Sequence, residues 1–355
     1  AVHVVETYLE PQHRHGRASV ARALGVDPIT VAQLALDPAI SGVDLRRALY
    51  LDTETTGLSG GTGTVPFLVG MATFEDESLR VTQMFLPELG REAPMLAVLA
   101  EHIERASCII TYNGKSFDWP LLRTRFVMNR VKAPPLPPHL DLLHCARRAF
   151  KARFASMRLC EMERQLLSMI REHDVDGAEI PGIYLTFLRT GSEPRLARVI
   201  EHNANDLIAL AALLGELEAR YAEVRPIDDP LDYLAFARIA HRAGDAAKAT
   251  AFALAAARGG GAPDCSVEAL FLTARLARAE GALDREERAL IEAFELAPPV
   301  ARGRIALALA KLYEHRLRDP ERALSYAILA ATEEESEPHG RRLARLRRRL
   351  AAKKP

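Results

Sequence analysis

The sequence has little cysteine, few aromatic residues, no net charge and no long apolar run. Its 355 residues include four cysteines, none in a C-x-x-C pair, which argues against a disulfide framework and indicates a reducing compartment. Forty-seven basic side chains balance 47 acidic ones, so any binding of nucleic acid has to be local. Without a run of about 18 apolar residues or a signal-peptide pattern, we expect a cytoplasmic protein with no membrane partner.

The cysteines leave one metal question open. Cys145 lies next to His144, and Cys160 follows later in the chain, so these side chains could in principle share an ion. The ligand spacing of zinc sites is missing, which favours buried or incidental thiols.

Two carboxylates stand at the end of a short apolar strand. Residues 48–57 read ALYLDTETTG, and alternation along a strand places Asp52 and Glu54 on one face. Buried together they would repel each other, unless a hard divalent cation neutralised them. The pair therefore predicts a metal site, although Asp-x-Glu alone is weak evidence.

Two later segments add the remaining side chains of the expected site. Residues 112–122 read YNGKSFDWPLL, where a β-type run passes into a helix that begins near Asp118. Residues 201–210 read EHNANDLIAL, and helical spacing puts His202 and Asp206 on one face. Four carboxylates with one histidine suit magnesium or manganese, often as two ions about 3.5–4 Å apart.

Together these motifs resemble the DEDD exonucleases of the ribonuclease H-like superfamily. Their order is similar to that in the proofreading domains of family B polymerases, and the strings LDTETTGLSGGTGT and NGKSFD look like the bacterial YprB-like branch. The resemblance covers residues 46–222. It implies a 3′–5′ exonuclease acting on single-stranded DNA or RNA with two Mg²⁺ or Mn²⁺ ions. Its metal ligands would be Asp52, Glu54, Asp118 and Asp206.

The third motif departs from the pattern of either branch. With a spacing of four residues the partner of the last aspartate is usually tyrosine, and the histidine branch usually has a spacing of five. Here His202 stands at the tyrosine spacing. Both residue types can orient or deprotonate a water, and histidine is the better general base at neutral pH. We therefore expect His202 to be catalytic, with an exposed helix histidine as the alternative.

The resemblance also implies contacts to the terminal nucleotide and a supporting acid. The substrate-binding residues would be Thr53, Thr55, Gly57, Asn113 and Lys115. Asp141 is expected near the metals without binding them. The glycine-rich residues 57–64 lack the Gly-Lys-Ser/Thr ending of a P-loop, which excludes nucleoside triphosphate binding there.

The predicted fold of residues 46–222 is a mixed five-stranded sheet with helices on both faces. Further strands are predicted at 67–74, 79–86, 108–111 and 139–144, and helices at 94–103, 117–127, 181–190 and around His202 up to about residue 222. Residues 171–179 are predicted to be an acidic turn without calcium-loop spacing. Residues 1–45 are predicted to be an extension, in which the His/Arg cluster at 12–17 is interpreted as a solvated turn rather than a phosphate contact.

Beyond a linker at residues 223–232, the chain is predicted to be all helical. The segments 234–257, 269–296 and 305–331 each read as helix–turn–helix, which predicts tetratricopeptide-like repeats over residues 233–355 that bind a protein partner. A plain helical bundle is the alternative. The arginine-rich end, residues 341–354, could bind phosphate backbones or cap the repeats.

Two other functions remain open from the sequence. An endonuclease on the same fold would release internal fragments rather than mononucleotides. A non-catalytic interaction protein would act through its repeats alone, but the complete set of acids argues against it.

Overall fold

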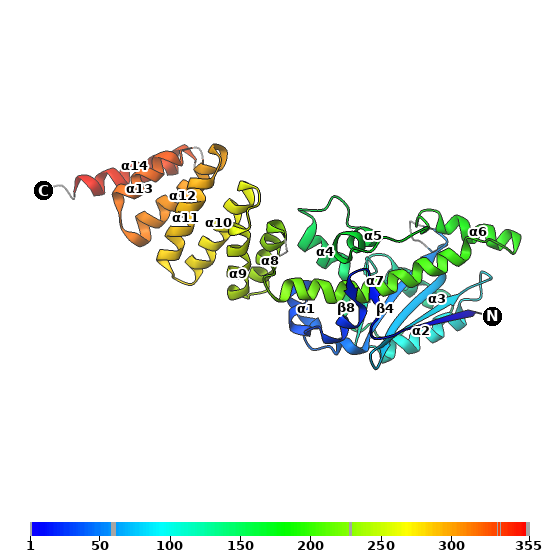
Figure 1. Cartoon of the computed structure of the whole chain (residues 1–355). Coiled ribbons are helices and arrows are strands. Elements are labelled where there is room, and N and C mark those ends of the chain that lie inside the picture. Colours follow the sequence, from blue (N-terminus) through cyan, green and yellow to red (C-terminus); the bar gives the residue numbers. More distant parts are fainter. Residues whose placement is uncertain (1, 58–61, 227–228, 332, 334, 353–355) are drawn as a thin grey trace. The chain divides into compact units, whose positions relative to one another are not determined.

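The structure, a computed structural model, describes residues 2–57, 62–226, 229–331, 333 and 335–352. Residues 58–61 of the glycine-rich loop and Lys353 and Lys354 of the basic end lie outside the described residues. The chain divides into two compact units, Ala1–Glu223 and Val224–Pro355 (Figure 1). Each unit is described by itself below.

A mixed sheet of six strands forms the centre of the first unit. Its order is β1-β6-β5-β4-β7-β8. The strands β4, β5 and β6 form an antiparallel meander, whereas β7 and β8 continue the sheet in parallel beyond β4. Their bounds are His3–Leu9 (β1), Ala48–Thr55 (β4), Pro66–Glu75 (β5), Ser78–Phe85 (β6), Cys108–Thr111 (β7) and His139–Asp141 (β8).

The mixed sheet is confirmed, and residues 46–222 supply five of its strands, β4 to β8, as predicted, but a sixth strand joins them from outside this range. The sixth strand, β1, comes from the N-terminal extension and pairs antiparallel with β6 along its full length, from His3 opposite Phe85 to Leu9 opposite Leu79. The outer edge of β6 would otherwise expose unpaired backbone groups, and β1 satisfies them. Six of the seven residues of β1 are exposed, so no buried face marks this strand in the sequence.

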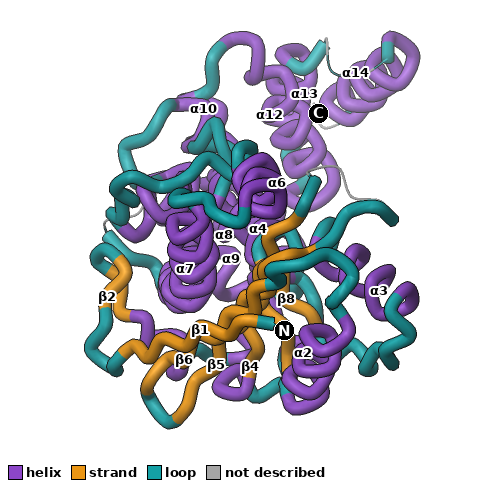
Figure 2. The backbone as a smooth tube through the Cα atoms, turned by 90° about the vertical axis from the view of Figure 1, so that its right-hand side faces the viewer, coloured by secondary structure: helices purple, strands orange, loops and turns teal. Residues whose placement is uncertain are grey.

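Helices cover both faces of the sheet, as predicted. On one face α2 (Ala93–Arg105) and α3 (Asp118–Met128) pack against Leu49 and Leu51 of β4. On the other face lie α6 (Ile180–Thr190) and the 27-residue α7 (Leu196–Ala222), which contacts β4, β5 and β6 (Figure 2). The even-numbered residues of β4, among them Asp52 and Glu54, therefore point toward α7.

The remaining helices of this unit are η1 (Val20–Gly25), α1 (Pro28–Ala35), η2 (Pro38–Ile40), η3 (Leu45–Arg47), α4 (Leu142–Phe150), α5 (Leu159–Met162) and η4 (Glu163–Leu167).

The His/Arg cluster of the N-terminal segment is not a solvated turn at His15. This residue belongs to a small hairpin of β2 (Arg14–His15) and β3 (Ala18–Ser19), is 3% exposed, and its Nε2 lies 2.5 Å from Oε1 of Glu163. Gly16 has φ +58°, and a Cβ there would lie 2.2 Å from the carbonyl oxygen of Leu167. The close approach requires glycine and holds the N-terminal segment against η4.

The second unit is helical, as predicted. Three pairs of helices, α8 with α9, α10 with α11 and α12 with α13, are followed by α14, and each helix contacts the next. Their bounds are Pro230–Arg242 (α8), Ala246–Arg258 (α9), Pro263–Ala279 (α10), Leu283–Leu296 (α11), Pro299–Leu312 (α12), Tyr313–Leu317 (η5), Pro320–Leu329 (α13) and Ser336–Ala351 (α14). None of the helices in the described residues is both long and apolar enough to cross a bilayer.

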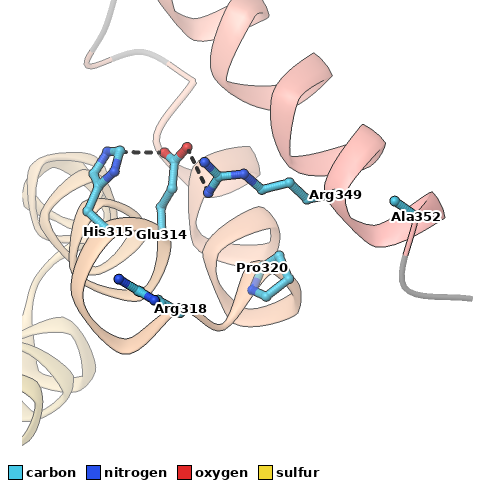
Figure 3. Close-up of a pocket in the computed structure, with 6 residues that line it drawn as sticks. All are labelled: Glu314, His315, Arg318, Pro320, Arg349 and Ala352. Carbon is cyan, nitrogen blue, oxygen red and sulfur yellow. Dashed lines mark ion pairs between the residues drawn. The ribbon is translucent and has the colours of Figure 1, made fainter.

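The arginine-rich last helix is bonded to a buried acid. Arg342 and Arg345 of α14 each place a nitrogen 2.6 Å from the carboxylate of Glu314, whose side chain is fully buried. Figure 3 shows the same carboxylate between His315 and Arg349. These contacts support the interpretation of the basic end as a cap, while Arg347 and Arg348 remain exposed.

Candidate active site

The acidic side chains predicted to bind metal come from three elements. Asp52 and Glu54 lie at the end of β4 on the side of α7, and Asp206 lies in the N-terminal half of α7. Asp118 is the first residue of α3, which packs on the opposite face of the sheet and begins beside the end of β4. The site therefore forms where both helical layers meet the end of one strand.

Burial and mutual repulsion raise the pKa values of these carboxyl groups. Burial raises the pKa of Asp52 well above its ordinary value, and the negative charges of Asp206 and Asp118 raise it further. Burial raises the pKa of Glu54 in the same way, and Asp52 is the next cause. Burial also raises the pKa of Asp118 to about 6. Such a cluster favours a cation or shared protons.

One oxygen of three of these carboxylates is bonded to a side-chain donor. The three contacts are Asn203 Nδ2 to Asp52 Oδ2 at 2.7 Å, Thr53 Oγ1 to Asp118 Oδ1 at 2.5 Å, and Arg171 Nη2 to Asp206 Oδ1 at 2.6 Å. A carboxylate fixed in this way through one oxygen has its second oxygen aimed in a set direction, which is how metal ligands are usually oriented.

His202 faces the carboxylates. Its Nε2 lies 3.8 Å from both Glu54 Oε1 and Asp206 Oδ2, and its side chain is 15% exposed. The other nitrogen, Nδ1, lies 2.7 Å from Asp174 Oδ1. A proton on Nδ1 satisfies Asp174 and leaves Nε2 unprotonated toward the site, as a general base requires. The four-residue spacing thus brings the histidine to the acids, and the exposed-surface alternative is not what the structure shows.

Arg171 joins three acids beside the site. Its guanidinium contacts Asp206, Asp174 at 3.3 Å and Glu163 at 2.9 Å. The side chain is 6% exposed, and burial is offset by these acids, so its pKa stays above the ordinary arginine value. Arg171 therefore supplies a fixed positive charge at the Asp206 side of the cluster.

Comparison with known proteins identifies the family. Residues 49–218 match the model of the RNase_H superfamily. The chain is also 30% identical, over 362 residues, to the uncharacterized protein YprB of Bacillus subtilis (strain 168), an alignment that covers 96% of this chain and 84% of the relative. The chain belongs to the same family as YprB, and its residues 49–218 form a domain of the RNase H superfamily. Membership of this superfamily indicates a nuclease, which hydrolyses nucleic acid with the help of divalent metal ions.

In this RNase H-like unit the predicted substrate-binding hydroxyls make internal contacts. Thr53 donates to Asp118, and Thr55 Oγ1 donates to the carbonyl oxygen of Gly57 at 2.8 Å. Both threonines are buried, at 7% and 5% exposure. Their hydroxyls shape the strand end, and the register shift between Glu54 and Thr55 turns the chain out of the sheet at the same place.

The predicted contacts at residues 113–115 are held by Asp141. The backbone N–H groups of Asn113 and Lys115 donate to its two carboxylate oxygens at 2.8 and 3.1 Å, and Asn113 adopts φ +71°. The ammonium group of Lys115 lies 3.7 Å from Asp37. Asp141 is 2% exposed and also caps α4 through the N–H of Leu143. Asp141 therefore fixes the backbone of the loop at residues 113–115.

The donor set fits a hard divalent cation by its chemistry. All four acids offer carboxylate oxygens, the ligands that Mg²⁺ and Mn²⁺ prefer. In the arrangement that the described residues adopt, no three His, Cys, Asp or Glu side chains converge as a ligand group. Mutual repulsion holds like charges apart, and Arg171 already neutralises one side of Asp206. A cation bound by these acids would therefore require small rotations of their side chains.

Arg171, Asp174 and Asn203 are the site residues that sequence reasoning missed. The first two lie in a segment without periodicity, where only a turn was predicted. Asn203 follows His202 directly, but its partner, Asp52, lies on β4, which no spacing along the helix reveals.

Proposed function

We propose that the chain is a metal-dependent 3′–5′ exonuclease that hydrolyses single-stranded nucleic acid with two Mg²⁺ or Mn²⁺ ions. The observation that carries the proposal is the grouping of Asp52, Glu54, Asp118 and Asp206 around the end of β4, with His202 turned toward them. The RNase H superfamily supports nuclease chemistry in general. The direction of digestion and the number of ions belong to the proposal.

The four acids can be assigned to two ions. Asp52, Glu54 and Asp206 would hold one ion, and Asp52 with Asp118 the other. Bound there, the ions supply stabilisation of the charge on the attacking and leaving oxygens of the phosphodiester.

His202 moves the proton of the attacking water. Its Nε2 accepts the proton, and the negative charge of Asp174 on the far side of the ring stabilises the resulting imidazolium. Asp174 is held in turn by Arg171 through its second oxygen, so the ring has little freedom to turn away.

The terminal nucleotide would lie against the turn that follows β4 and against the loop over Asp141. The expected contacts are Thr53, Thr55, Gly57, Asn113 and Lys115, although the two threonine hydroxyls and the N–H groups of Asn113 and Lys115 already donate within the chain. The side chain of Lys115 is 39% exposed, so its ammonium could contact a phosphate beside Asp37.

The second unit would serve the substrate or a partner. We propose that its helix pairs are tetratricopeptide-like repeats, which bind a protein partner, and that the enzyme works in the cytoplasm. The repeated pairing of neighbouring helices supports the first proposal, and four cysteines without a disulfide pattern support the second.

The test is cleavage of end-labelled single-stranded DNA and RNA by the purified chain in Mn²⁺, with products resolved by length. Mononucleotides released from the 3′ end support the proposal. Internal fragments of substrates whose ends are blocked would instead assign an endonuclease. No cleavage of either polymer would favour an interaction protein.

A further inference from the structure

A glycine stands between two polar residues on the face of the sheet that carries the site. Asp52 of β4 is paired with Gly70 of β5, and Gly70 is paired with Gln83 of β6. Directly paired residues of antiparallel strands point to the same side, so the three form a row toward α7. The middle position of this row has no side chain.

Asn203 of α7 fills the gap. A Cβ on Gly70 would lie 2.2 Å from Asn203 Oδ1 and 2.9 Å from Asn203 Cγ. Asn203 is 0% exposed, so its amide is sealed between the helix and the sheet. A buried amide needs hydrogen-bond partners, and the neighbours of Gly70 provide them.

The hydrogen bonds fix which way the amide of Asn203 points. Gln83 Nε2 donates at 2.8 Å both to the carbonyl oxygen of Ile200 and to Asn203 Oδ1. Because Ile200 offers only an acceptor, Gln83 has to present its NH₂ group, and Asn203 has to present its oxygen to it. The NH₂ group of Asn203 is then directed at Asp52 Oδ2, 2.7 Å away.

We propose that Asn203 is a positioning residue of the metal site: seated on Gly70 and oriented by Gln83, it fixes one oxygen of Asp52 and aims the other at the cation. The inference rests on the proposed function in one respect, which is that Asp52 binds metal. Asp52 is the acid assigned to both ions, so its orientation affects the whole site. Outer-shell donors of this kind commonly change metal affinity by about 10–100-fold.

The first experiment measures binding of Mn²⁺ alone to the full chain by calorimetry. Asn203→Ala should weaken Mn²⁺ binding by about 10-fold or more. Asn205→Ala is the matched control, because two residues along a helix turn the side chain by about 200°, away from the sheet, and its affinity should equal that of wild type. A folded Asn203→Ala chain with wild-type Mn²⁺ affinity overturns the inference. So does a fall in Tm without any change in affinity, which indicates a role in packing only.

The second experiment tests whether Asn203 has to pack directly against Gly70. Gly70→Ala should push Asn203 from Asp52 and weaken Mn²⁺ binding to a similar extent. In the double variant Gly70→Ala/Asn203→Ala the clash with Asn203 is gone, and the added Cβ meets the end of the Leu207 side chain, Cδ1 at 2.8 Å, which can rotate away. Its affinity should therefore lie within about 2-fold of that of Asn203→Ala. Two losses that multiply fully would show that Gly70 does not act through Asn203, and would overturn this part of the inference.

A variant of Gln83 covers the case in which Asn203→Ala fails to fold. Gln83→Met keeps the size of the side chain and leaves Asn203 in place, but removes the donor that orients its amide. Its Mn²⁺ affinity should fall by a smaller factor, and an unchanged affinity overturns the inference.

The outcomes separate this inference from the proposed function. Weakened Mn²⁺ binding by Asn203→Ala in a chain that cleaves no nucleic acid supports the inference and rejects the exonuclease. An active wild-type chain, with an Asn203→Ala variant whose Mn²⁺ affinity is unchanged, supports the exonuclease and rejects the inference. A wild-type chain that binds no Mn²⁺ overturns both.

Discussion

At the scale of single residues, the site is a balance between like charges and a few fixed donors. Asp52, Glu54, Asp118 and Asp206 raise one another's pKa values or lose solvation together, and Arg171 and His202 lie at the edge of the cluster. Removing one acid should therefore affect metal binding and stability in opposite directions.

We expect Asp52→Asn to abolish nuclease activity while the chain stays folded. The amide keeps the shape of the carboxylate but loses the charge that holds a divalent cation. The Tm in EDTA should equal or exceed that of wild type, since repulsion is relieved. Asp76→Asn, at an exposed turn with φ +54°, is the matched control. Full activity of Asp52→Asn in Mg²⁺ or Mn²⁺ would contradict the metal site, and Asp206→Asn should behave like Asp52→Asn.

His202→Ala should lower kcat by about 10²–10⁴-fold, the usual contribution of a general base. His202→Tyr should retain more activity, because tyrosine is usual at this spacing in the resembling branch. His241→Ala, an exposed histidine in α8, serves as the control. Turnover is compared at saturating Mn²⁺. Wild-type turnover in both His202 variants would show that this histidine takes no part in the chemistry.

The pKa shift of Asp118 predicts how the stability of the metal-free chain depends on pH. Its folded-state pKa of about 6 exceeds the ordinary value of 3.8, so the folded chain binds the proton more tightly. The resulting stability is fully present below pH 3.8 and is lost as the pH rises through 6. In EDTA, the drop in Tm from pH 5 to pH 7.5 should be smaller for Asp118→Asn than for wild type. Equal drops would contradict the shift.

At the scale of elements, the regular parts of the site were predictable and the irregular parts were not. Alternation in β4 and the i, i+4 spacing in α7 identified four of the five catalytic candidates, because each depends on a local period. The edge strand β1 and the segment with Arg171 and Asp174 have no such period. The packing of Asn203 against Gly70, between Asp52 and Gln83, depends on the strand register between β4, β5 and β6, which a single sequence does not reveal.

The segment after η4 should matter for turnover more than for metal binding. Asp174→Asn keeps the shape of the side chain but can offer its NH₂ group to His202 Nδ1, which favours the tautomer with the proton on Nε2. We expect kcat to fall at least about 10-fold, with Mn²⁺ affinity close to that of wild type. Asp176→Asn, two residues further on, is the control. A loss of Mn²⁺ affinity equal to the loss of kcat would assign Asp174 to the metal instead.

At the scale of the whole molecule, chemistry and recognition are expected to separate. Every proposed catalytic side chain lies in the first compact unit, which ends at Glu223. A fragment of residues 1–225 should therefore fold and cleave short single-stranded oligonucleotides. It should bind long substrates or a partner protein more weakly, because repeats present extended surfaces and α14 is rich in arginine.

Cleavage of short and long substrates by the fragment and the full chain, at two salt concentrations, measures this difference. We expect the fragment and the full chain to cleave the short substrate equally well, and the fragment to be less active on the long substrate. A folded fragment that has lost activity on short oligonucleotides would show that the second unit contributes to catalysis.

The position of Arg171 has a consequence for the life of the protein in a cell. Because Arg171 places one positive charge of the cluster in the chain itself, we expect the protein to fold without a divalent ion. Under the proposed function, the amount of folded protein would then be set by synthesis and turnover, whereas its activity would follow the supply of magnesium or manganese. Folded but inactive protein would accumulate when these ions are scarce, and it would become active on binding them.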